Sequence, residues 1–93
     1  MTVKKIEVSQ NSTVECGDGP LLISVRKLGP FSDEPKRANV TVGAIGHANV
    51  TRELFPGDLI LFSAGDKGEF EVRLLQFAGP HDERAVFQVA RLK

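Results

Sequence analysis

The chain has 93 residues, of which 41% are hydrophobic and 26% charged, and its 12 basic and 12 acidic side chains cancel. This length suits one domain with a single core, and the composition excludes intrinsic disorder and a membrane span. Without a net charge there is no overall field to recruit nucleic acid or an anionic membrane.

The first part of the chain alternates strand-like runs with turns. Residues 3–8 partly alternate polar and apolar side chains, and the pair Lys4-Lys5 suits an exposed sheet edge. Residues 13–16 predict a short strand that ends at the Gly-Asp-Gly-Pro turn of residues 17–20. Residues 21–28 predict a longer strand, and its inward set is Leu21, Ile23 and Val25. Residues 29–37, with no period, predict the longest loop.

The middle of the chain predicts three further strands. Residues 38–45 are strand-like, with Gly43 as a bulge or a close approach, and residues 49–54 follow as a short strand. The four letters Ala-Asn-Val-Thr occur at 38–41 and at 48–51, which we interpret as neighbouring strands with similar starts. Residues 55–58 form a Pro-Gly turn, and the apolar run 59–62 predicts a central strand buried on both faces.

Three segments, 11–13, 39–41 and 49–51, match the Asn-x-Ser/Thr glycosylation pattern. Asparagine beside β-branched residues is expected at strand ends, and a three-residue pattern is degenerate. We interpret the three matches as strand-end chemistry.

The clearest organised stretch is a predicted hairpin of residues 69–77 and 84–92. With residues 78–83 as the loop, Phe77 faces Arg84, and counting back pairs Leu75 with Val86, Leu74 with Phe87 and Val72 with Val89. One face then forms part of the core and carries Phe70, Val72, Leu74, Phe87 and Val89.

The other face of this hairpin is polar at one end and apolar near the loop, where Leu75, Phe77 and Val86 gather. One interpretation is a bulge near Leu74-Leu75 that turns Phe77 inward, or a cover formed by the loop of residues 29–37. The other is that Leu75, Phe77 and Val86 form an exposed interaction patch.

These elements predict an all-β fold: an antiparallel β-sandwich of about seven short strands, with a small closed β-barrel as the alternative. The segment Asp66-x-Gly68-x-Phe70-x-Val72 resembles the Asp-x-Gly-x-Tyr-x-Cys strand of immunoglobulin-like domains over seven residues, with Phe and Val in place of Tyr and Cys. The resemblance implies a sandwich and carries no function.

The sequence is poor in catalytic chemistry. Cys16 is the only cysteine, so no intrachain disulfide forms, and the only histidines, His47 and His81, lie in expected turns. A Cys–His pair would be the minimum nucleophilic device, but no nucleophile motif surrounds Cys16. Histidine and cysteine spacing does not fit a zinc site, and the turn aspartates fit turn chemistry better than calcium. We expect no catalytic, cofactor-binding or metal-binding residues.

The leading functional hypothesis is therefore a non-catalytic protein-interaction or assembly module, either a homo-oligomer or a part of a phage or mobile-element complex. A small-ligand-binding β domain is the alternative, and an enzyme that uses Cys16 comes third. The expected partners are another protein or a second copy, with no nucleic acid and no membrane. Polar residues from Glu7 onward interrupt any signal peptide, so we expect a cytoplasmic location.

Overall fold

The computed structural model describes residues 3–16, 21–29, 37–80 and 83–92. It consists of eight strands and one 3-10 turn. The elements are β1 (Val3–Ser9), β2 (Ser12–Cys16), β3 (Leu21–Gly29), β4 (Arg37–Gly43), β5 (Val50–Leu54), β6 (Leu59–Ser63), η1 (Gly65–Lys67), β7 (Glu69–Ala78) and β8 (Arg84–Arg91).

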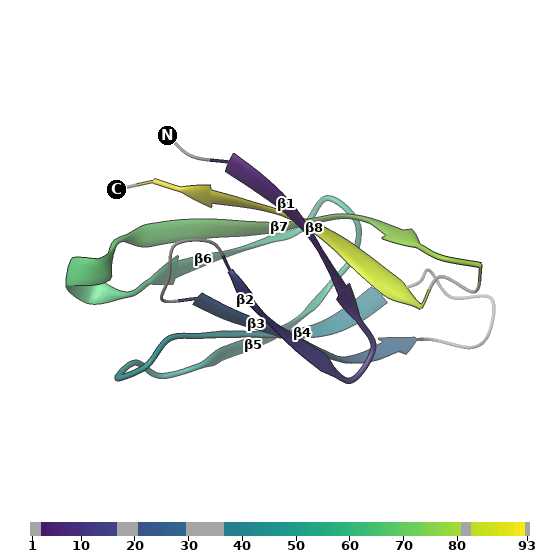
Figure 1. Cartoon of the computed structure of the whole chain (residues 1–93), viewed down its shortest axis with the longest axis horizontal. Coiled ribbons are helices and arrows are strands. Elements are labelled where there is room, and N and C mark those ends of the chain that lie inside the picture. Colours follow the sequence, from purple (N-terminus) through teal and green to yellow (C-terminus); the bar gives the residue numbers. More distant parts are fainter. Residues whose placement is uncertain (1–2, 17–20, 30–36, 81–82, 93) are drawn as a thin grey trace.

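The described strands form two packed antiparallel sheets and no closed barrel, so the predicted sandwich is confirmed. We call β1-β8-β7-β6 the terminal sheet and β2-β3-β4-β5 the middle sheet. They are the upper and lower layers of Figure 1. The chain starts in the terminal sheet, crosses to the middle sheet for four consecutive strands, and crosses back for the last three.

Both crossings are held by backbone hydrogen bonds. At the first crossing, between β1 and β2, Asn11 adopts a left-handed backbone conformation (φ 63°), and its N–H donates to the Val25 carbonyl at 2.7 Å. The N–H of the preceding residue, Gln10, donates to the Glu83 carbonyl at 3.1 Å. At the second, the Gly57 N–H donates to the Leu74 carbonyl at 2.8 Å, and the Leu74 N–H donates to the Asp58 carbonyl at 3.0 Å. Each turn is thereby fixed to a strand that is distant in sequence.

The core lies between the sheets and is apolar throughout the described residues, with no buried polar or charged residue among them. Alternate residues of each strand point inward, as the sequence indicates for residues 21, 23 and 25. The five residues predicted for the core face of the hairpin are all buried. The largest fully buried side chains are Phe87, Leu21, Ile23, Ile60 and Leu74.

The hairpin register is partly as predicted. Val72 opposes Val89 and Leu74 opposes Phe87, but a bulge between Leu74 and Gln76 leaves Leu75 without an opposite residue. Beyond it Gln76 opposes Val86 and Phe77 opposes Ala85. The predicted pairs Leu75–Val86 and Phe77–Arg84 are therefore wrong, because the extra residue shifts the register. The bulge interpretation is confirmed, since Phe77 packs against the core.

The prediction that residues 59–62 form a central strand is wrong. β6 is an edge strand of the terminal sheet, and Leu61 is 65% exposed. The outward positions of β6 include Leu59 and Leu61, so its sequence does not show the polar and apolar alternation of a strand with one face in solvent. β1 is the other edge of this sheet, as its lysine pair predicts.

The ends of β4 and β5 also refine the prediction. β4 ends at Gly43, and residues 44–47 form a turn. In this turn the His47 N–H donates a hydrogen bond to the Ala44 carbonyl at 3.0 Å. Gly43 marks a close approach, since a Cβ atom there would overlap Oδ1 of Asn49. β4 and β5 are neighbours, as the repeated four letters predict.

The loop predicted for residues 29–37 falls mostly outside the described residues, and its ends, Gly29 and Arg37, belong to β3 and β4.

The topology differs from that of immunoglobulin domains. In those domains the strand that carries the Asp-x-Gly motif pairs with a strand several positions earlier, in a Greek key. Here β7 pairs with β6, the strand immediately before it, and β2 to β5 form a simple meander. The resemblance correctly indicates a sandwich but not the order of its strands.

The bulge predicts different costs for two neighbouring substitutions. Phe77→Asp places a carboxylate against the core and should lower the free energy of unfolding by about 2 kcal/mol or more. Leu75→Asp, at the unpaired bulge position, should cost at least about 1 kcal/mol less than that. Urea unfolding of the two variants measures both values, and equal costs would contradict the inward orientation of Phe77.

Candidate functional site

The structure separates the three residues of the predicted interaction patch. Val86 is only 7% exposed, on the outer face of the terminal sheet. Phe77 is half-buried and packs against the core, and Leu75 is half-buried at the bulge. Of the three, therefore, only Leu75 and Val86 lie away from the core, and Val86 offers little surface to a partner.

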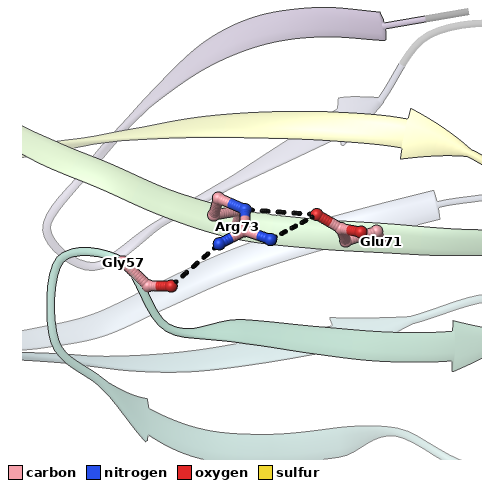
Figure 2. Close-up of polar contacts among 3 residues, drawn as sticks. All are labelled: Gly57, Glu71 and Arg73. Atoms are coloured by element: carbon pink, nitrogen blue, oxygen red, sulfur yellow. Dashed lines mark hydrogen bonds and ion pairs between the residues drawn. The ribbon is translucent and has the colours of Figure 1, made fainter.

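The polar cluster on the same sheet serves the second crossing (Figure 2). Arg73 donates from Nε and NH2 to Oε1 of Glu71 at 3.2 and 3.1 Å, and from NH1 to the Gly57 carbonyl at 3.1 Å. Asp58 Oδ2 accepts the Phe55 N–H at 2.9 Å, which is the turn chemistry expected of that aspartate. These bonds fix the turn of residues 55–58, and the guanidinium is already engaged.

The two described residues of the candidate Cys–His device do not form a pair. Cys16 is 6% exposed at the end of β2, and burial raises the pKa of its thiol above the ordinary value, with a smaller opposing effect from Lys4. His47 is exposed in the β4–β5 turn, with its ring against Gly65. No hydrogen bond joins these two residues, and His81 lies outside the described part. A buried protonated thiol is a poor nucleophile.

The outer face of the middle sheet carries a feature that the sequence analysis missed. Thr13, Ser24, Thr41 and Thr51 stand opposite one another in one line across all four strands, and we call them the hydroxyl row. Strands lie about 4.8 Å apart, so the row is about 14 Å long.

The hydroxyl row is partly bonded within itself. The Thr13 and Ser24 hydroxyls share a hydrogen bond of 2.7 Å, and the Thr41 and Thr51 hydroxyls share one of 2.9 Å. Each bond uses one hydroxyl hydrogen, so two of the four hydrogens and several lone pairs remain for another partner. The row can donate and accept at the same time.

The hydroxyl row lies in an open depression of about 480 Å³ on this face. The depression is open and mainly polar, unlike the enclosed and mostly apolar clefts that hold drug-sized ligands. We call it the polar depression, because eight of the nine described residues that line it are polar or charged. They are Asn11, Ser12, Thr13, Ser24, Val25, Arg26, Thr41, Asn49 and Thr51.

Local structure explains how the other polar groups reach this depression. A register shift between Val25 and Lys27 leaves Arg26 unpaired in β3, beside the crossing where Asn11 binds the Val25 carbonyl. Asn49 lies over Gly43, where any larger residue would push its amide away. The bulge at Arg26, the crossing at Asn11 and the absence of a side chain at Gly43 therefore place these polar groups around the depression.

A sequence signal for the hydroxyl row did exist. The three Asn-x-Ser/Thr segments end in Thr13, Thr41 and Thr51, which are three of the four members. Joining them required the register of four strands, which the sequence alone does not give.

Comparisons of the chain with protein-family models, curated proteins and solved structures give no match.

Among the described residues there is no group of three or more His, Cys, Asp or Glu side chains that could hold a metal ion. In the same residues no helix has the length and apolar character needed to span a membrane.

The raised pKa of Cys16 predicts slow labelling and a loss of stability at alkaline pH. In the native protein a disulfide reagent should react about tenfold or more slowly than in the urea-unfolded chain, because the thiolate is scarce and covered. The unfolded thiol ionises near its ordinary pKa of 9.0 while the folded thiol stays protonated, so stability should fall as the pH rises past 9.

Cys16→Ala is the control for this prediction, since it removes the thiol contribution to the alkaline decline. Native labelling as fast as in the unfolded chain would contradict the burial of Cys16.

Proposed function

We propose that this domain is a non-catalytic binding module that contacts its partner through the outer face of the middle sheet. The observation that carries the proposal is the polar depression, which unites free hydroxyl donors and acceptors, two asparagine amides and a guanidinium. Sites built on strands hold their groups in fixed positions, which lowers the cost of binding.

The protonated state and burial of Cys16 support a binding role over catalysis. The polar groups of the described lining are hydroxyls, amides and one guanidinium, with no carboxylate, imidazole or thiol among them. Such a set recognises and orients a partner but supplies no general base.

The proposal is tested by amide NMR of the labelled domain with four probes: trigalacturonate, its neutral methyl ester, hexaglutamate and hexalysine. We expect at least one probe to shift the amides of residues 11–13, 24–26, 41 and 49–51 and to leave β6 and β7 unchanged. Silence with all four probes, or shifts confined to the terminal sheet, would overturn the proposal.

Self-association is the second candidate, and the terminal sheet favours it. Its outer face exposes Val3, Leu61 and Leu92, at 50%, 65% and 42% respectively, near one end of the sheet. Val3 opposes Ala90 in the register, Ala90 opposes Glu71, and Glu71 opposes Leu61. Val3 and Leu61 therefore lie in one row across the sheet, with Ala90 and Glu71 between them, and exposed apolar side chains on one face favour a contact surface.

If this face self-associates, light scattering should give a mass above that of the 10.1 kDa monomer at high concentration. Leu61→Glu should then restore the monomer, whereas Leu75→Glu on the same sheet should not. A monomer at every concentration would remove self-association without affecting the binding proposal.

A further inference from the structure

We infer that the polar depression binds an acidic oligosaccharide, whose carboxylate or sulfate group pairs with Arg26. This inference rests on the proposed binding function and names the ligand class of the same face. It depends on the charge of the lining, on its lack of apolar anchors and on the geometry of the hydroxyl row.

The charge of the lining favours an anion. Nine described residues line the depression; among these Arg26 is the only charged one, and none has a carboxylate. Arg26 is exposed and has no ion-pair partner within the described part of the chain. A guanidinium with free N–H groups matches the two oxygens of a carboxylate or sulfate.

Two acidic residues on the outer face of the middle sheet lie close to the hydroxyl row, but they do not cancel the positive charge of Arg26. Glu15 and Glu53 occupy outward positions in the rows on either side of the hydroxyl row, and neither lines the depression. Glu53 is paired with Arg37 at 3.0 Å, which neutralises it locally. The described lining itself therefore carries one positive charge and no negative one.

The polarity of the lining favours a sugar over a peptide. Protein partners are held mainly by aromatic or aliphatic anchors in apolar pockets, and Val25 is the one apolar residue among the described lining residues. Sugar rings present many hydroxyls, each able to donate and to accept, and the hydroxyl row offers the same chemistry in return.

The absence of aromatic residues from the lining favours a charged sugar over a neutral one. Neutral sugars are commonly held by stacking on aromatic rings, and no Phe of the described part of the chain lines the depression. An ion pair with Arg26 supplies an attraction that a neutral sugar would lack. The open shape and the length of the row, about 14 Å, suit a short chain of sugar units more than a single enclosed one.

Isothermal titration calorimetry at low salt tests the inference with trigalacturonate and a sulfated heparin-type disaccharide as acidic probes. The methyl ester of trigalacturonate is the matched neutral probe, and hexaglutamate is the acidic peptide. We expect at least one acidic sugar to bind, and the acidic sugar that binds identifies the anionic group. The methyl ester should bind about tenfold or more weakly than trigalacturonate if the carboxylate is that group.

Two variants locate the interaction. Arg26→Gln should weaken binding of the acidic sugar by about ten- to a hundredfold, because it removes a charged hydrogen bond. Arg52→Gln, on β5 of the same sheet but outside the lining, is the matched control and should change the affinity less than about threefold. Thr41→Val keeps the shape and should also weaken binding. Unfolding curves confirm that each variant folds.

Other outcomes would overturn the inference. Equal binding of trigalacturonate and its ester, with no sulfated-sugar binding, would show that charge is not recognised. Binding of hexaglutamate alone through Arg26 would assign an acidic protein segment instead, and the binding face would survive. Binding of an acidic sugar that Arg26→Gln leaves unchanged, or no binding of either acidic sugar, would also overturn it.

Discussion

The burial of one face of each sheet is the constraint on which this structure depends. Each fully buried Val, Leu, Ile or Phe contributes about 1.5–3 kcal/mol, and at least ten such side chains lie between the sheets. A slip of one residue in any strand would expose its whole inward set. Since the net stability of a domain is only about 5–15 kcal/mol, the register cannot slip.

This constraint also fixes the outer faces. A surface hydroxyl bond such as that between Thr41 and Thr51 contributes only about 0.5–1.5 kcal/mol, too little to set a register. The inward packing of Ile23, Val25, Val40 and Val42 therefore decides that Ser24 and Thr41 point outward and face each other. The hydroxyl row is a consequence of the core, held in place by residues that do not line it.

Each of the two bulges changes which residues of its strand point toward the core and which point outward. The extra residue at Leu75 returns Phe77 to the core near the end of the terminal sheet. The extra residue at Arg26 places a cation beside the first crossing and next to the hydroxyl row. In both strands the bulge leaves one residue unpaired and increases the local twist.

Much of the fold could be predicted from the sequence, because period-two alternation and Gly-Pro turns are local signals. They located the strands and the buried faces of β3, β7 and β8. The edge position of β6 was not visible, since leucine occupies its outward positions. Nor was the hydroxyl row, because its four members come from four strands whose mutual register is a long-range property.

A crystal structure of the domain with the acidic sugar that binds, trigalacturonate or the sulfated disaccharide, tests whether the outer face of the middle sheet is the contact surface of this domain. We expect a carboxylate or sulfate at the Arg26 guanidinium and sugar hydroxyls along Thr13, Ser24, Thr41 and Thr51. A sugar bound to the terminal sheet or between the sheets would contradict it.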